Sequence, residues 1–377
     1  MVNPLGWAIL AVGLTLAWAA AQTGWREVAV VSTAFLLLLV LALPFLLGRT
    51  SVKVEVVLEP QRVVAGESVA AGLSVTNTAP RRLLPTMLEL PVGAAVQRYA
   101  VPSLGPRAVH EETFTVRTGK RGVIGVGPAT TRRGDPLSIY SRDVAWTGVT
   151  EILVRPPMVP LDSLGAGLLR DLEGVSTDAI SQSDLAFHAL REYTPGDDLR
   201  HVHWRSSAKA SQLLVRQYLD TRRSHATIVV DDAPSSWATD NDFEAAMSVA
   251  ASIAVRAVLD EFEATFVCGK QVSSGSDGTR VLDAVCRAGL TGSGLVAAAN
   301  RAARTAPDTS LLFLVSGAAT SFEAFQRAAA VFPPEARRFA MIVDATSRTR
   351  VTETGGLPVL HLAGKDDLAA LLHWSVR

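Results

Sequence analysis

The chain has 377 residues, and 36 lysines and arginines balance 36 aspartates and glutamates, so its formal net charge is zero. This length favours two or three domains. The charge balance argues against the global field that attracts nucleic acid, so nucleic acid is not an expected partner. Cys268 and Cys286 lack the Cys-x-x-Cys spacing of zinc and redox motifs, which indicates small buried side chains in a reducing compartment.

Two uncharged segments predict a transmembrane helix hairpin within residues 1–50. Leu5–Ala21 and Val28–Leu47 contain no charged residue, and the second is 20 residues long, the length that spans a hydrocarbon core of about 30 Å. Ala19–Ala21 would suit a signal peptidase, but Met1–Pro4 offers no basic residue for the n-region of a signal peptide. We therefore expect a multi-pass anchor in the cell membrane.

The placement of basic residues predicts how this hairpin is oriented. The turn Gln22–Glu27 contains a single basic residue, Arg26, whereas Arg49, Lys53 and Arg62 follow the second segment. Basic residues accumulate on the cytoplasmic side of membrane proteins. Both termini and the soluble domains are therefore expected in the cytoplasm.

Residues 51–158 contain short runs of β type, separated by Gly, Pro and Asn. Lys53–Val56, Val69–Thr76 and Thr113–Arg117 alternate apolar and polar residues, and Glu151–Ile152–Leu153–Val154 closes the region. We predict a β-sandwich domain here. The spaced glycines of residues 122–127 lack the strand–loop–helix context of a phosphate-binding loop and are expected to serve turn geometry.

Residues 159–377 alternate buried strands with helices. Ala226–Val230, Leu311–Val315 and Phe339–Val343 are continuous apolar runs, and Asp240–Phe262 has helical spacing. This alternation predicts an α/β domain with a doubly wound, mainly parallel sheet of Rossmann type. Ligands of such sheets bind at the carboxyl ends of the strands, which directs attention to Asp231.

The densest polar and aromatic stretch of the chain is Arg191–Lys209. Pro195–Gly196 fits the centre of a type II turn, after which Asp197 or Asp198 can cap a short helix. The opposite charges of this stretch predict a hydrogen-bonded network that fixes a loop. The run carries no established catalytic motif, and helix capping accounts for its paired aspartates, so no catalytic residue is assigned.

This stretch resembles the core pattern of a bacterial membrane-protein family with the domain of unknown function DUF58, many of whose members have a von Willebrand factor A-like fold. The matching residues are Arg191, Tyr193, Pro195, Gly196, Asp197, Asp198, Arg200, Trp204, Ser207 and Ala208. The match continues from Leu213 to Asp231. His203 is a departure, because the family often has Asp there.

The resemblance implies a membrane-anchored interaction or scaffold protein that acts with a MoxR-type AAA+ ATPase in the assembly or maturation of a client at the cell envelope. A membrane-associated hydrolase and a metal-dependent adhesion module are the alternatives. The stretch is expected to form a structural and partner-facing unit that also includes Arg205. Within it, Arg200 is expected to pair with a carboxylate, and Trp204 to be at least partly buried.

The resemblance also suggests a position for a divalent cation such as Mg²⁺. Von Willebrand A domains hold the ion with Asp-x-Ser-x-Ser, a Thr from a second loop and an Asp from a third. Here the first element is Asp231-Asp232-Ala233-Pro234-Ser235, the second loop offers Thr291 or Ser293, and Ser316–Gly317 stands where the third often has Asp–Gly. The candidate ligands are Asp231, Ser235 and Thr291. The loss of one hydroxyl and one carboxylate favours a degenerate site that serves loop shape or protein contact.

Overall fold

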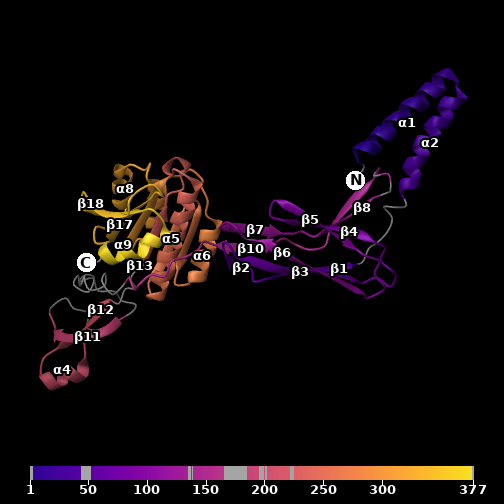
Figure 1. The fold of residues 1–377 in the computed structure, drawn as a ribbon. Helices are drawn as coiled ribbons and strands as arrows, with labels where there is room; N and C mark the ends of the chain where they lie inside the picture. The colour runs from indigo at the N-terminus through magenta and orange to yellow at the C-terminus, as the bar shows by residue number, and fades with distance from the viewer. Residues whose placement is uncertain are drawn as a thin grey trace. The chain divides into compact units, whose positions relative to one another are not determined.

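The structure is a computed structural model that describes residues 3–43, 52–134, 137, 139–164, 185–194, 199, 202–220 and 225–375. The chain divides into two compact units, Met1–Arg155 and Pro156–Arg377. The fold is a mixture of α and β elements (Figure 1).

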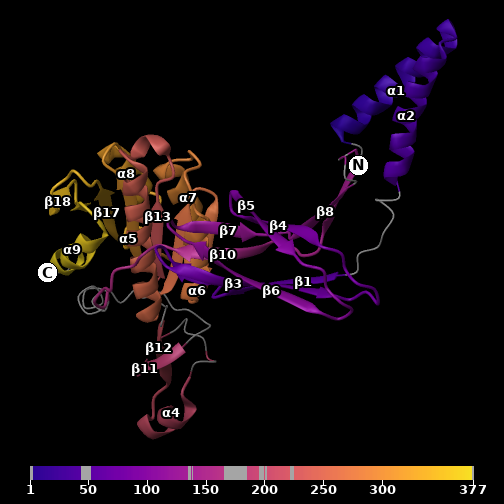
Figure 2. The ribbon, with the colours of Figure 1, turned by 45° about the vertical axis from the view of Figure 1, so that its right-hand side comes forward.

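Unit 1 begins with two helices, α1 (Pro4–Thr23) and α2 (Arg26–Ala42). Proline at the first turn starts α1, and Gly24 ends it in the left-handed conformation at φ 71°. The helices pack side by side (Figure 2), and the Ser32 hydroxyl donates a 2.9 Å hydrogen bond to the carbonyl of Gly13. Of the described helices, α1 is long and apolar enough to cross a membrane. The predicted second segment extends beyond α2 into residues 44–47, which lie outside the described part of the chain.

Two sheets make up the rest of unit 1. The antiparallel sheet β1–β3–β6 consists of Val52–Glu59, Ser68–Asn77 and Val109–Arg117. The second sheet has the order β2–β10–β7–β4–β8–β9, with β5 paired to β4. Both sheets contribute to one hydrophobic core, for example through Leu73 of β3 and Leu88 of β4. The strands of the second sheet are β2 (Arg62–Val64), β4 (Thr86–Val92), β5 (Ala95–Val101), β7 (Gly122–Val126), β8 (Thr130–Gly134), β9 (Ser141–Ala145) and β10 (Thr150–Arg155).

The main sheet of unit 2 has seven strands in the order β15–β14–β13–β16–β17–β19–β18. The five inner strands are parallel to one another, and the two edge strands are antiparallel to their neighbours. The strands are β13 (His225–Val230), β14 (Glu263–Cys268), β15 (Gln271–Gly275), β16 (Leu311–Gly317), β17 (Arg337–Val343), β18 (Arg350–Thr354) and β19 (Leu357–Leu362).

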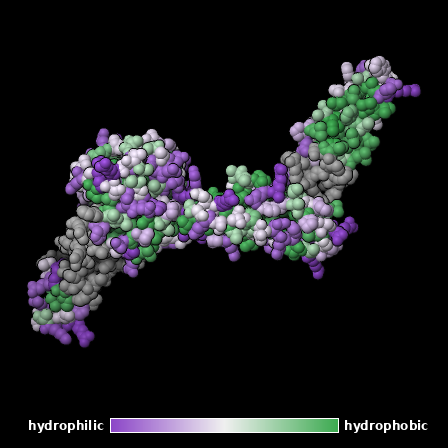
Figure 3. All heavy atoms as spheres, viewed as in Figure 1, coloured by the Kyte–Doolittle hydropathy of each residue, from purple (hydrophilic) through white to green (hydrophobic). Residues whose placement is uncertain are grey.

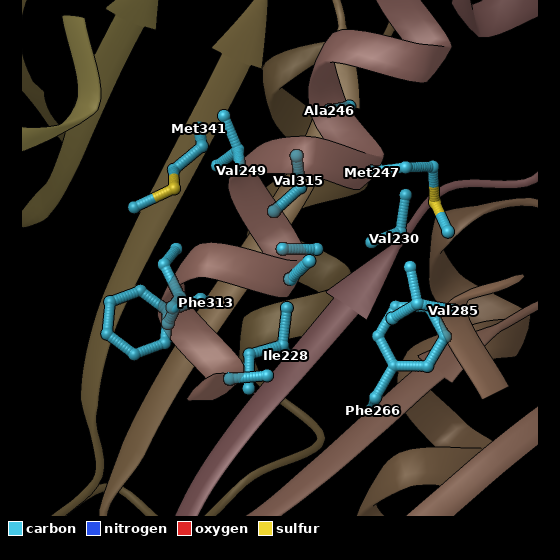
Figure 4. Close-up of a cluster of buried hydrophobic side chains, with 14 of the residues drawn as sticks. Ile228, Val230, Ala246, Met247, Val249, Phe266, Val285, Phe313, Val315 and Met341 are labelled. Atoms are coloured by element: carbon cyan, nitrogen blue, oxygen red, sulfur yellow. The ribbon is translucent and has the colours of Figure 1, made fainter. Parts of the chain in front are cut away.

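Helices cover both faces of this sheet, which is why its inner strands are apolar on both sides. Successive residues of β13 point to opposite faces, so Ile228 and Val230 join one core while Val229 joins the other. Figure 4 shows the first core, where α5 lies over side chains such as Phe313 and Met341. The helices are α5 (Asp240–Leu259), α6 (Gly278–Arg287), α7 (Leu295–Thr305), α8 (Phe322–Ala329) and α9 (Leu368–Ser375), with short 3₁₀ turns at Pro234–Ser236 and Lys365–Asp367.

Unit 2 also contains a separate two-stranded antiparallel sheet of β11 (Leu185–Glu192) and β12 (Leu214–Asp220). The short helix α4 (Trp204–Ala210) lies between these strands in sequence. His203 caps α4, because its Nδ1 accepts a 3.2 Å hydrogen bond from the amide of Ser206.

Candidate functional site at the carboxyl edge of the main sheet

Two consecutive aspartates, Asp231 and Asp232, follow β13 at the carboxyl edge of the parallel strands. The chain passes from β13 to β14 on one side, and β16 lies on the other side of β13. The strand order therefore reverses between β13 and β16, and such a switch point leaves a crevice where α/β sheets bind ligands. Both aspartates are buried, with 1% and 0% of their surface exposed.

The carboxylate of Asp231 accepts hydrogen bonds from the turn after β13 and from the end of β16 with the loop that follows it. Its Oδ2 receives the hydroxyls of Ser236 at 2.7 Å, Ser316 at 2.8 Å and Thr320 at 3.3 Å. Its Oδ1 accepts the Ala233 amide at 2.9 Å, which closes a tight turn directly after the strand. Hydroxyls and an amide thus satisfy this buried negative charge and join the end of β13 to the end of β16.

Asp232 ties the same strand to the beginning of α7. Its Oδ2 accepts the hydroxyls of Thr291 and Ser293, and its Oδ1 accepts the Gly294 amide at 2.8 Å. Burial by itself raises the pKa of Asp232, but these hydrogen bonds outweigh burial and hold the pKa below its ordinary value. Asp232 is therefore an ionised carboxylate at a helix N-terminus, where negative charge is stabilising.

Two glycines allow the loops of this edge to approach closely. A Cβ at Gly317 would lie 2.1 Å from the carbonyl oxygen of Ser236, so the backbone leaves no room for a side chain there. A Cβ at Gly269, whose φ is +56°, would lie 2.7 Å from Oδ2 of Asp232. Both positions require glycine, and at Gly269 the backbone conformation requires it as well.

The surface over Asp231 is a shallow hollow of about 270 Å³. Hydroxyl groups and the beginnings of α7 and α8 surround it, and Asp231 is the acidic residue that faces it. Such a surface combines hydrogen-bonding groups in fixed positions with apolar side chains, which suits contact with another protein surface. The lining residues are Asp231, Ser236, Ser293, Gly294, Leu295, Val296, Ala297, Thr320, Ser321 and Ala324.

The three candidate metal ligands do not converge on one point. Asp231 faces the hollow, but Ser235 is exposed, and the Thr291 hydroxyl donates to Asp232. Among the described residues, no group of three or more His, Cys, Asp or Glu side chains could hold a metal ion. Asp231 with its hydroxyl partners supplies oxygen ligands but a single negative charge, so the residues fit a dedicated Mg²⁺ site poorly.

Sequence reasoning missed Ser236 and Thr320 as partners of Asp231. Residues Pro234–Ser236 form a 3₁₀ turn. This turn brings the hydroxyl of Ser236, and not that of Ser235, within hydrogen-bond distance of the Asp231 carboxylate. The proline after Ala233 was the available signal for such a turn. Thr320 lies 89 residues from Asp231, and no local pattern links the two.

The structure describes part of the Arg191–Lys209 stretch. Pro195, Gly196, Asp197, Asp198 and Arg200 lie outside the described residues. The Arg191 guanidinium donates to the carbonyl of Glu192 at 3.1 Å and to the hydroxyl of Thr194 at 3.3 Å, and the Tyr193 amide donates to the Leu213 carbonyl at 2.9 Å.

The expectation that Trp204 is partly buried is wrong. Trp204 is the first residue of α4 and is 65% exposed. Arg205 beside it is exposed as well. The physical reason is the orientation of α4, which turns Ser207 and not Trp204 towards β12. The Ser207 hydroxyl accepts the Leu214 amide at 2.9 Å.

Residues 189–272 match the model of the family described as protein of unknown function DUF58. The match runs from β11 into β15, so it includes α4 and the Asp231–Asp232 pair. It covers less than half of the chain and relates this portion to that family. A search of curated proteins finds no match.

Solved structures give weak likenesses. The CARDB domain of a Pyrococcus furiosus protein is 16% identical with a TM-score of 0.22, and the match covers 28% of this chain and 93% of that chain. The DNA glycosylase AlkC of Pseudomonas fluorescens is 14% identical with a TM-score of 0.21, and the match covers 29% of this chain and 31% of that chain. The ApaA protein of Bordetella pertussis is 14% identical with a TM-score of 0.21, and the match covers 28% of this chain and 94% of that chain. At these TM-scores the likenesses carry no argument about function.

Proposed function

We propose that this protein is a membrane-anchored scaffold that works with a MoxR-type AAA+ ATPase on a client at the cell envelope. The observation that carries the anchor is the surface of α1 and α2. Four of their five buried residues are small, while large apolar side chains such as Trp18 and Val30 point outwards, 68% and 69% exposed. The buried residues are Gly6, Gly13, Ser32, Ala42 and the larger Leu39. Figure 3 shows these helices covered by hydrophobic residues.

This distribution is the reverse of a water-soluble helix pair. In water, large apolar side chains face the partner helix, whereas in a bilayer small residues form the helix contact and large apolar ones face the lipid. The hydrogen bond from Ser32 to Gly13 is also typical of membrane helices, which use hydroxyls to join neighbours. These features support a hairpin that spans the membrane. The basic residues after the second segment support an orientation in which both termini, the sheets of unit 1 and the whole of unit 2 are cytoplasmic.

A topology reporter tests this anchor. Basic residues follow the second segment and are few in the turn, so a reporter that is active outside the cytoplasm should stay silent when fused after Arg377. The same reporter inserted between Thr23 and Arg26 should be active, which provides the matched control. Activity of the C-terminal fusion would contradict the proposed orientation.

The soluble part is proposed as the interaction module. We infer that the two sheets of unit 1 form a β-sandwich and that the main sheet of unit 2 is von Willebrand A-like. The shared core of the two sheets and the aspartates at the switch point support this interpretation. At that edge, hydroxyls and amides bind the carboxylates of Asp231 and Asp232, an arrangement that suits a fixed docking surface better than a general acid or base.

Co-elution tests the partnership. The detergent-solubilised full chain should elute from a sizing column together with a purified MoxR-type ATPase from the same genome when ATP is present. The ATPase alone, and the ATPase with an unrelated two-helix membrane protein, serve as controls. Separate elution at every nucleotide state would contradict the partnership.

A metal-dependent adhesion module is the second candidate. The observation in its favour is the gathering of three hydroxyl oxygens around Oδ2 of Asp231. Hydroxyl and carboxylate oxygens are the ligands that hard divalent cations prefer. The Mg²⁺ titration described in the Discussion separates this candidate from the scaffold.

A further inference from the structure

The short helix α4 presents one tryptophan and two cations on a single exposed face. At 100° per residue, Trp204, Ala208, Arg205 and Lys209 fall within an arc of about 140°, and all four are exposed. We call these four residues the α4 surface. Ser207 lies outside this arc, is buried and joins α4 to β12 through the Leu214 amide. The packing of α4 therefore does not depend on the α4 surface.

The residues of the α4 surface do little for the stability of the helix itself. Trp204 leaves 65% of its surface in water, so its large apolar area gains little from folding. Arg205 is in the first turn, where the helix dipole disfavours positive charge, and the first turn of α4 has no acidic residue. Positions that break local rules without a gain in stability are commonly functional.

The helix α4 is basic, and exposed apolar residues lie near it in the sequence. The seven residues of α4 include two basic residues and no acidic one, in a chain whose net charge is zero. Leu199 and Leu213 nearby in sequence are 56% and 40% exposed. Figure 3 shows hydrophobic and hydrophilic residues next to one another at the α4 end of this segment. An exposed aromatic ring beside two cations complements an apolar pocket that has carboxylates on one side.

We propose that the α4 surface is the docking site for an acidic protein surface, with Trp204 entering an apolar pocket and Arg205 and Lys209 facing carboxylates on one side of that pocket. Tryptophan and arginine are the residues most enriched among those that dominate protein interfaces. Lipid headgroup binding typically uses clusters of four to eight basic residues, and α4 offers two, so a protein partner is favoured over a membrane surface. This inference rests on the proposed function, because it assigns the ATPase to this surface.

The test measures binding of the purified MoxR-type ATPase to the full chain in nanodiscs of neutral lipid. Trp204→Ala, and the double reversal Arg205→Glu with Lys209→Glu, should each weaken binding at least tenfold. Trp204→Phe should retain part of the affinity, and rising salt should weaken the wild type more than the reversal. The matched control is Arg280→Glu with Arg304→Glu, which makes the same charge change at exposed positions of α6 and α7 and should stay within twofold of the wild type.

Each result decides a separate point. If the wild type binds and the α4 variants bind equally well, the docking site is wrong while the partnership stands. If the wild type fails to bind, both are wrong. If the fluorescence of Trp204, taken as wild type minus Trp204→Phe, shifts to the blue when anionic lipid replaces neutral lipid without ATPase, the surface binds lipid and the protein-docking proposal is overturned. An unchanged melting profile of each variant confirms that loss of binding is not loss of folding.

Discussion

The hydroxyl of Ser316 donates a 2.8 Å hydrogen bond to Oδ2 of Asp231, and the two residues are 0% and 1% exposed. Asp231 follows β13, and Ser316 is near the end of β16, 85 residues later. The bond therefore joins the carboxyl ends of two neighbouring parallel strands. The hydroxyl from β16 thus helps to offset the cost of burying the Asp231 carboxylate away from water.

Ser316→Ala is expected to lower the free energy of unfolding by about 1.5–3 kcal/mol, because a hydrogen bond to a buried carboxylate is lost. Hydrogen exchange of the β13 and β16 amides measures this stability separately from that of the membrane helices. Ser235→Ala is the control, since Ser235 is exposed and should change exchange little. Equal exchange in the two variants would contradict the structural role of the Ser316 hydroxyl.

Gly317→Ala should destabilise the same sheet by about 1–3 kcal/mol, because the new methyl group would collide with backbone. Its Cβ would be 2.1 Å from the Ser236 oxygen and 3.0 Å from the Trp237 Cα. Gly289→Ala is the matched control, since a Cβ there meets no atom within 4 Å. Hydrogen exchange of β16 should rise in the first variant alone, and a wild-type rate would show that the loops separate easily.

His225 should make the stability of unit 2 depend on pH. The ring is buried at the start of β13, and its Nε2 lies 2.7 Å from the Thr265 hydroxyl. Burial lowers the pKa of His225, although Asp308 and Glu263, at 3.7 Å and 3.8 Å, favour the charged form and oppose this effect. The folded state thus prefers the neutral ring more than the unfolded state does.

The sign follows from this preference. The contribution of the neutral ring to stability is complete above the unfolded pKa of about 6.5 and is lost as the pH falls through the lower folded pKa. Urea unfolding of the full chain at pH 7.5 and 5.5, compared with His225→Gln, measures the effect. The wild type should lose more stability than the variant between these two pH values. A larger loss in His225→Gln would mean that the carboxylates, and not burial, dominate.

Mg²⁺ should change the melting temperature of the full chain little. Hydroxyl donors already satisfy Asp231, and Asp232 accepts hydrogen bonds from residues 291–294, so either carboxylate would lose hydrogen bonds if it bound an ion. An ion at a hundredfold excess over its Kd would stabilise the fold by about 2.7 kcal/mol, which differential scanning fluorimetry detects easily. A shift of that size, absent with a monovalent salt of equal ionic strength, would favour the adhesion module.

The mixed α/β organisation could be predicted from the sequence because its signals are local. The runs Ala226–Val230 and Leu311–Val315 are apolar at every position, a pattern that suits a strand covered on both faces, and the structure places β13 and β16 there. The first uncharged segment, Leu5–Ala21, likewise lies within α1. The strands alone do not show that Asp231 and Asp232 lie at a switch point, because that depends on the order of the strands in the sheet.

The candidate site was predictable in its position and not in its contacts. The end of β13 identified Asp231, but which hydroxyls reach its carboxylate depends on the 3₁₀ turn at Pro234–Ser236 and on the neighbouring strand β16. The exposure of Trp204 likewise depends on which side of α4 packs against β12. A tryptophan in a short helix carries no local signal of its orientation.

The sequence by itself determined where the chain forms apolar helices, alternating strands and buried parallel strands, because hydrophobic periodicity acts over neighbouring residues. The tertiary structure alone decided that Ser236, Ser316 and Thr320 meet at Asp231, and that Trp204 faces the solvent. The contacts of Ser316 and Thr320 with Asp231 join residues 85 and 89 positions apart in the chain. Such contacts form only when the strand order and the close approach at Gly317 bring the loops together.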